Sequence, residues 1–290
     1  MITLSRTLGA ITMAALLSAC GGGGGGGPRT EFNYQPFDST VAGQSRIAAV
    51  GLIRLDGDFG PEGSEVVTGT LQREDRTLTV TLDGAGQITG VFDPDTERWK
   101  SSDTVVMAYA DLSGNFDFFI PVQVAYGGLN GFSDPYVIGV VSRTEDLPST
   151  GTFVFDGSAM VGANLSANTA TTNSYSQSSG TLVLRGNFGS SHVNGTISGL
   201  AGMPFTTVQL TDLQMSGGAD ATFALDSDST ITFSNGSGAV VPNTGDGTTN
   251  YASGAFFGGD GSGPVEAGGV FAVVGEDGNI WGIFAADDRR

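Results

Sequence analysis

The segment ASGAFFGGDGSGPVEAGGVFAVVGEDGNIWGIFAA, residues 252–286, gives the clearest indication of the fold. It holds three apolar runs, at 252–257, 269–274 and 279–284, and the last two are joined by EDGN, a sequence typical of a β-hairpin turn. Glycine beside large aromatic residues favours a small closed barrel, because rings fill the interior and glycine relieves tight bends. Strand alternation predicts one interior set: Phe256, Val270, Ala272, Val274, Ile280, Gly282 and Phe284.

Segments of the same kind precede this stretch. Period-2 alternation predicts strands at 152–155, 181–185, 193–198, 206–215, 222–225 and 230–233. Two polar stretches, residues 164–180 and 236–250, interrupt them and are expected to be exposed loops. Eight or so short strands with Gly, Asp and Asn turns indicate an antiparallel barrel or sandwich over residues 148–290.

A first β-rich region occupies residues 32–147. Strands are expected at 46–55, 77–82, 87–92, 104–110, 115–125 and 135–142, with a turn at 83–84 that makes a hairpin of the second and third. Its core is expected to contain the aromatic residues Trp99, Phe116, Phe118 and Phe119. The sequence Leu147-Pro148-Ser149 suggests the boundary with the second region. The predicted fold class is therefore all-β.

The N-terminus indicates the compartment. Residues 1–19 have a basic Arg6 and a short apolar stretch, as in a signal peptide. Leu17-Ser18-Ala19-Cys20 resembles the bacterial lipobox, which implies cleavage before Cys20 and lipidation of its sulfur. Residues 20–31, with an unbroken glycine run, are expected to be a flexible tether. Gly21 after the cysteine favours sorting to the outer membrane.

Composition narrows the partners. The chain has 290 residues with 12 basic and 30 acidic side chains, a net charge of -18, so it repels nucleic acids. Cys20 is the only cysteine, which excludes a disulfide within the chain and a cysteine zinc site. A membrane partner is expected through the lipid on Cys20.

No catalytic motif stands out. His192 is the only histidine, and it is interpreted as a polar residue that opens a strand. Asp56-x-Asp58 and Asp226-x-Asp228 are interpreted as turns, because a calcium loop needs six or seven converging oxygens. A pair of acidic residues for glycoside hydrolysis depends on geometry that the sequence does not give. We expect no enzyme, no cofactor and no metal.

The C-terminal region resembles the β-barrel domain of the transferrin-binding protein B family of surface lipoproteins. Three passages carry the resemblance: residues 147–157 (LPSTGTFVFDG), residues 194–199 (NGTISG), and the GAFFG, EAGGVF and WGIFAA sequences of residues 254–286. The resemblance implies a small eight-stranded antiparallel β-barrel at residues 148–290, preceded by a handle-like domain at residues 32–147. The larger family members have two such lobes, whereas this chain has room for one.

These observations predict a lipid-anchored lipoprotein of the bacterial outer membrane, exposed at the cell surface. Its function would be non-catalytic binding of an extracellular protein or solute, with nutrient (iron) acquisition as one purpose. Tyr175 and Tyr251 are the candidate partner-binding residues, because tyrosine is common in binding hot spots. Two alternatives stay open: a lipocalin-like carrier with a small molecule inside the barrel, and a structural envelope lipoprotein.

Overall fold

The computed structural model describes residue 34 and residues 48–288 with gaps, namely 48–52, 69–74, 77–82, 86–93, 98–101, 105–109, 112–114, 116–126, 133–166, 173–242, 244–259 and 262–288. The chain divides into two compact units, residues 1–31 and 32–290, and the described residues belong to the second. They are β-strands and connections, with one short 3-10 helix at Thr144–Asp146. The predicted all-β class is confirmed.

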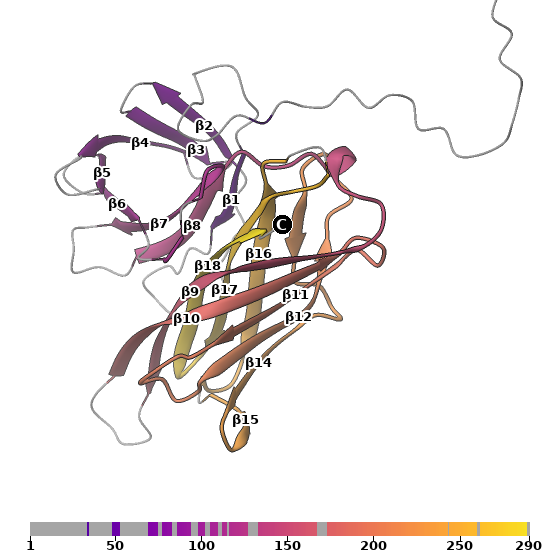
Figure 1. Ribbon diagram of the computed structural model, residues 1–290. Helices are drawn as coiled ribbons and strands as arrows, with labels where there is room; N and C mark the ends of the chain where they lie inside the picture. Colours follow the sequence, from indigo (N-terminus) through magenta and orange to yellow (C-terminus); the bar gives the residue numbers. More distant parts are fainter. Residues whose placement is uncertain are drawn as a thin grey trace, which may run out of the picture. The chain divides into compact units, whose positions relative to one another are not determined.

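The first eight strands close into an antiparallel barrel (Figure 1). Each strand pairs with the next, and β1 also pairs with β8. The strands are β1 (Ala48–Leu52), β2 (Gly69–Glu74), β3 (Thr77–Leu82), β4 (Gly86–Asp93), β5 (Arg98–Ser101), β6 (Val105–Tyr109), β7 (Phe119–Tyr126) and β8 (Ser133–Gly139). The hairpin predicted around residues 83–84 is confirmed, since Leu82 pairs with Gly86.

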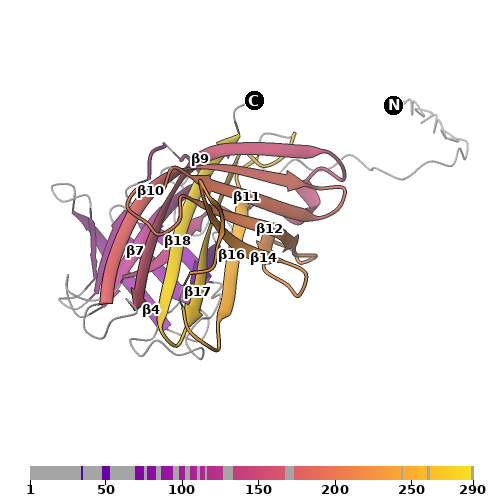
Figure 2. The same cartoon turned by 90° about the horizontal axis from the view of Figure 1, so that it is seen from below.

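The remaining strands form a ten-stranded antiparallel sheet whose pairing also closes into a ring. They are β9 (Thr152–Ser166), β10 (Asn173–Asn187), β11 (His192–Ser198), β12 (Thr207–Met215), β13 (Thr222–Ala224), β14 (Thr230–Asn235), β15 (Gly238–Val240), β16 (Thr249–Phe257), β17 (Glu266–Gly275) and β18 (Gly278–Asp288). Figure 2 shows β9 to β12 as successive neighbours. The ring of eight runs β9-β10-β11-β12-β13-β16-β17-β18 and returns to β9.

The hairpin of β14 and β15 is not one of these eight strands, although Ile231 and Phe233 of β14 pack into the same core. It attaches to the edge of β12, where Thr207 pairs with Ser234 and Thr211 with Thr230. We call the closed ring with its attached hairpin the second barrel. The predicted eight-stranded antiparallel barrel is thus confirmed, with two strands beyond the eight.

The sequence placed a loop at residues 164–180, and the structure corrects this. β9 and β10 extend through most of it, with every residue from Thr152 to Ser166 paired to one from Asn173 to Asn187. Their backbone groups are satisfied by this long ladder, so the many Ser and Asn side chains need not form a loop. The other predicted loop, 236–250, includes β15 and the start of β16, together with the turn between β14 and β15 and the connection from β15 to β16.

Phenylalanine rings fill the interior of the second barrel. Phe256 lies among Phe155, Phe188 and Phe223, with ring centroids 5.7, 5.3 and 5.3 Å from its own. Phe271 and Phe284 belong to the same buried cluster. Gly282 leaves space for a ring, whereas the prediction was that glycine relieves a bend: a Cβ at Gly282 would collide with the ring of Phe271, its partner across β17 and β18.

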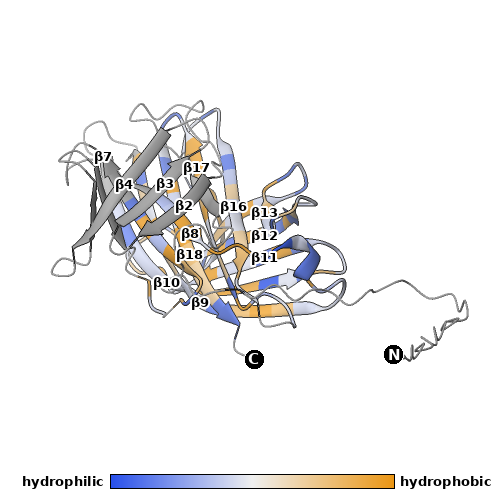
Figure 3. Ribbon diagram, turned by 90° about the horizontal axis from the view of Figure 1, so that it is seen from above, coloured by the Kyte–Doolittle hydropathy of each residue, from blue (hydrophilic) through white to orange (hydrophobic). Residues whose placement is uncertain are grey.

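The predicted interior set is partly wrong. Phe256, Ile280 and Phe284 do face the interior, whereas Val270, Ala272 and Val274 belong to a second buried cluster on the outer face. The pairing register explains the difference, because Phe271 and Val273 are opposite Gly282 and Ile280, so the intervening residues point outward. Every residue of β17 is buried, and Figure 3 colours much of β17 and β18 as hydrophobic.

The first barrel covers this outer face. Phe119 of β7 stacks on Phe257 of β16 with ring centroids 4.6 Å apart, and Val137 of β8 joins the same cluster. Phe116 and Phe118, predicted to fill the core of the first region, are half-buried against this shared cluster instead. Trp99, the fourth aromatic residue of that prediction, has a side chain outside the described part. The two barrels therefore share one apolar layer.

Candidate functional site

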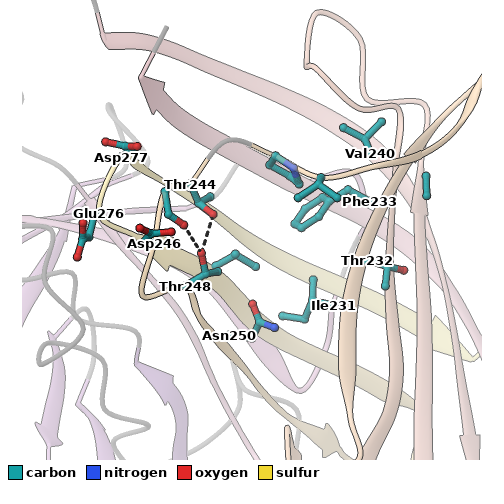
Figure 4. A pocket seen from close by; sticks show the side chains of 15 residues that line it. Ile231, Thr232, Phe233, Val240, Thr244, Asp246, Thr248, Asn250, Glu276 and Asp277 are labelled. Carbon is teal, nitrogen blue, oxygen red and sulfur yellow. Dashed lines mark hydrogen bonds between the residues drawn. The ribbon is translucent and has the colours of Figure 1, made fainter. Parts of the chain in front are cut away.

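A pocket of about 710 Å³ lies at one end of the second barrel (Figure 4). Three pieces of chain surround it: the hairpin of β14 and β15, the connection that leads from β15 to β16, and the turn between β17 and β18. Its lining residues are Ile231, Thr232, Phe233, Ala239, Val240, Val241, Pro242, Thr244, Gly245, Asp246, Thr248, Asn250, Val273, Glu276 and Asp277. Most of the connection belongs to the polar stretch that the sequence marked as exposed.

One wall of the pocket is held by hydrogen bonds between the connection and the turn. The Asp277 N–H donates to the carbonyl of Thr244 at 2.8 Å, and the Glu276 N–H donates to the carbonyl of Asp246 at 3.2 Å. The hydroxyls of Thr244 and Thr248 are 3.0 Å apart. Gly245 has φ +82°, and a Cβ there would meet the Asp277 nitrogen at 2.7 Å, so the contact requires glycine. This wall is preformed.

The pocket has an apolar side and an acidic side. The apolar side of the pocket consists of buried residues of the barrel core, namely Ile231, Phe233 and Val273. Asp246, Glu276 and Asp277 are exposed and, in Figure 4, gather away from Phe233 and Val240. Such a pocket can bind an apolar group and a positive charge at the same time.

Val241 stands at the edge of the pocket with 93 % of its surface exposed. Among the described residues it is the large hydrophobic side chain that the fold leaves uncovered. A single exposed valine is ordinary, but one that continues an apolar pocket lining extends the surface that a partner can cover.

The predicted partner-binding residues do not line this pocket. Tyr251 lies on β16, pairs with Ala272, and packs half-buried against the outer-face cluster. Its neighbour Asn250 does line the pocket, so alternation along the strand turns Tyr251 away from it. Tyr175 lies on β10 opposite Asn164, and its side chain is outside the described part of the structure. Their binding role stays a prediction.

Other predictions concern residues near or beyond the described range. Cys20 lies outside the described residues, as does Asp56-x-Asp58. The Asp226 carboxylate accepts hydrogen bonds from the N–H groups of Asp228 and Ser229 at 3.0 Å and from the Ser229 hydroxyl at 2.8 Å. The Ser229 hydroxyl is the main cause of a lowered pKa of Asp226. Asp226 therefore forms a capped turn, as interpreted.

His192 opens β11, as the sequence indicated. Its side chain is half-buried, and its buried Nδ1 has no hydrogen-bond partner. Within the described ranges no three His, Cys, Asp or Glu side chains are grouped as metal ligands. No helix in those ranges is both long and apolar enough to span a membrane.

Sequence reasoning missed a buried carboxylate where the two barrels meet. Glu266 of β17 accepts the N–H groups of Asp117 and Phe118 at 2.6 and 3.0 Å. Burial raises the pKa of Glu266 to about 7, and the Asp117 and Asp287 carboxylates also raise it, while the two N–H groups lower it. A glutamate that starts an apolar run carries no sequence signal for this, because its partners are 148 and 149 residues away.

The N-terminal end of the second unit is fastened at the connection between the barrels. The Tyr34 hydroxyl donates to the Asp146 carboxylate at 2.5 Å and accepts the Arg143 N–H at 2.8 Å. Arg143 in turn pairs with Asp146 through two hydrogen bonds, at 2.7 and 2.8 Å. Burial raises the pKa of Tyr34 to about 12, so this hydroxyl stays protonated and keeps donating.

Two closed antiparallel barrels that share an apolar layer define a paired-barrel lobe. Its fold is that of transferrin-binding protein B, which confirms the predicted resemblance for the fold. The mutant transferrin-binding protein B from Haemophilus parasuis has a TM-score of 0.53 and 16% identity over 84% of this chain and 45% of its own. The chain thus spans about half the length of that protein.

Two further solved structures are similar at lower scores. Transferrin-binding protein B from Neisseria meningitidis has a TM-score of 0.45 and 12% identity over 83% of this chain and 56% of its own. HpuA from Kingella denitrificans, solved in complex with human haemoglobin, has a TM-score of 0.42 and 14% identity over 89% and 94%. No family model matches the sequence, and no curated protein matches it.

Proposed function

We propose that this protein is a lipid-anchored surface lipoprotein of the bacterial outer membrane that binds an extracellular protein without catalysing a reaction. The observation that carries the proposal is the preformed pocket at the end of the second barrel, with the exposed Val241 beside it. Rigid β-scaffolds commonly bind partners through the loops at one end. The fold shared with transferrin-binding protein B supports the same function.

A small molecule inside the barrel is the less favoured alternative. Lipocalin-like carriers need an interior cavity, whereas Phe155, Phe223, Phe256, Phe271 and Phe284 are fully buried in one cluster within the described ring. A ligand that displaced these rings would expose a large apolar area. The end of the barrel is therefore the better site for a partner.

The test is saturable capture by the full chain, immobilised in mild detergent and incubated with spent growth medium or animal serum. One variant replaces residues 238–248 with a Gly-Ser linker of equal length, and a control variant replaces the exposed turn residues 216–218 in the same way. We expect one protein to be captured saturably by the wild type and the control but not by the first variant. Equal capture by all three, or none by the wild type, would contradict the proposal.

The location has its own test. Intact cells that express the protein are treated with a protease, and the folded part is followed by immunoblotting. We expect cleavage at the surface while a periplasmic marker stays intact. Full protection of the folded part would place the protein inside the cell envelope and would exclude capture of external partners.

A further inference from the structure

The acidic side of the pocket at the end of the second barrel has no positive charge of its own. Asp246, Glu276 and Asp277 contribute three carboxylates, and no lining residue is Lys, Arg or His. Within the described residues, these three side chains have no ion pair and no hydrogen bond. Their charges are therefore available to a ligand, and the excess of 30 acidic over 12 basic residues attracts cations to the whole molecule.

The apolar side fits the rest of a basic side chain. Lys and Arg have long hydrocarbon stems that pack on apolar surface while the charged head reaches a carboxylate. Phe233 and Val240 supply such a surface across the pocket from the acidic side (Figure 4). Val273 also lines the pocket. An inorganic cation would leave this surface uncovered, so charge alone does not describe the site.

The position of Val241 favours a protein over a small molecule. Its side chain is 93 % exposed at the pocket edge, where a ligand confined to the pocket would leave most of it in water. A protein segment that enters the pocket with a basic residue can cover Val241 with an apolar neighbour. Such apolar contacts around a charged pair also exclude water and strengthen it.

We infer that the pocket receives a Lys or Arg side chain, next to an apolar residue, from the surface of a partner protein. The inference rests on the proposed function and names the chemistry of the partner. Arg is favoured over Lys, because its guanidinium is always charged, carries several donors and is less strongly hydrated than an ammonium, so it packs more readily on apolar surface.

Fluorescence anisotropy with labelled, capped pentapeptides tests this on the full chain in mild detergent. The probe alternates leucine with arginine. The comparison peptides alternate leucine with glutamate, which reverses the charge, and serine with arginine, which removes the apolar part. We expect saturable binding of the leucine–arginine peptide only, weakened by salt because exposed charge pairs are screened.

Matched variants assign the binding to the pocket. Glu276→Gln with Asp277→Asn removes two charges from the acidic side, and Asp212→Asn with Asp228→Asn removes two exposed charges outside the pocket. We expect the first pair to weaken binding of the leucine–arginine peptide about fivefold, as for two exposed ion pairs, and the second to leave it nearly unchanged. Val241→Ser should also weaken it, because it removes apolar contact without changing the charge.

Three results would overturn the inference: no binding of the leucine–arginine peptide, equal binding of all three peptides, or equal loss in the two pairs of charge variants. These failures are distinct from failure of the proposed function. If a protein is captured saturably from medium or serum but the Glu276 and Asp277 substitutions do not affect it, the binding function stands and this chemistry is wrong. If the leucine–arginine peptide binds but no protein is captured, the pocket has the inferred chemistry and the proposed function is wrong.

Discussion

Glu266 shows how one residue can make the fold respond to pH. Its pKa of about 7 in the folded protein lies above the ordinary value of 4.5, because burial disfavours the charged form. The folded state therefore holds the proton more tightly than the unfolded state. The contribution of this proton to the unfolding free energy is fully present below about pH 4.5, and it is lost as the pH rises through about 7.

We predict that Glu266→Gln flattens this dependence. A pKa difference of about 2.5 corresponds to about 3 kcal/mol of unfolding free energy, so the wild type should lose up to that amount between pH 5 and pH 8.5 relative to the variant. Urea unfolding at both pH values measures the difference, with the exposed Glu276→Gln as a control. Parallel pH curves for wild type and Glu266→Gln would contradict the assignment.

The sequence predicts the local structure around a residue well where that structure depends on contacts with its near neighbours in the chain. The turn at 276–279 and the capped turn of Asp226 were predictable because short-range chemistry sets them. Glu266 and the Tyr34 fastening were not, because their partners are more than a hundred residues distant. The only sequence signal for the pocket was the polar stretch at residues 236–250, because the apolar side of the pocket comes from strands β14 and β17.

At the scale of strands, close packing between β17 and β18 requires glycine at position 282. A Cβ there would overlap the ring of Phe271, which fills the barrel from the neighbouring strand. Interiors at crystal-like density have no room for an additional methyl group unless the ring moves. The glycine is needed for space, since its φ is not among the positive values.

Gly282→Ala is therefore expected to lower the unfolding free energy by about 1–3 kcal/mol, as overpacked cores do. Gly217→Ala, at an exposed position with no atom within 4 Å of the new Cβ, should change it by less than about 0.5 kcal/mol. Chemical denaturation followed by tryptophan fluorescence measures both. Adding Phe271→Leu to Gly282→Ala should restore part of the loss, whereas strict additivity would argue against this contact.

The predicted strands were too short, and some of their residues were assigned to the wrong face of the sheet. Residues 152–155 were predicted as a strand, and β9 continues to Ser166 because its partner β10 is equally long. Alternation located the interior residues Phe256 and Phe284, but it also assigned Val270 to that side. A strand that is buried on both faces reads as a continuous apolar run, so periodicity cannot separate the two sides.

For the whole molecule, the untested prediction with the largest effect concerns the anchor. Cys20→Ser should abolish incorporation of labelled palmitate and move the protein from the membrane fraction to the aqueous fraction, because the acyl chains supply the binding energy. Gly24→Ala, in the glycine run that follows the cysteine, should change neither. If the Cys20→Ser variant still carries label, the site or the modification has been assigned wrongly.

The organisation of the chain into two barrels could be predicted only in part from the sequence. The order of a β-rich region followed by a barrel was predictable from turn spacing and glycine–aromatic pairs. That the first region is itself a closed ring of eight strands was not, because β2 and β5 lack clear alternation and closure pairs β1 with β8 over a long separation. The domain boundaries at residues 31 and 147 stay proposals.

The fastening of Tyr34 has a mechanical consequence. With the N-terminus held as proposed, a pull on a bound partner would also load Tyr34, whose hydroxyl is bonded to Arg143 and Asp146. That load would reach the connection between the two barrels, where Arg143 and Asp146 lie. Under this pull, the strands of the first barrel would separate only after the hydrogen bonds of Tyr34 had broken.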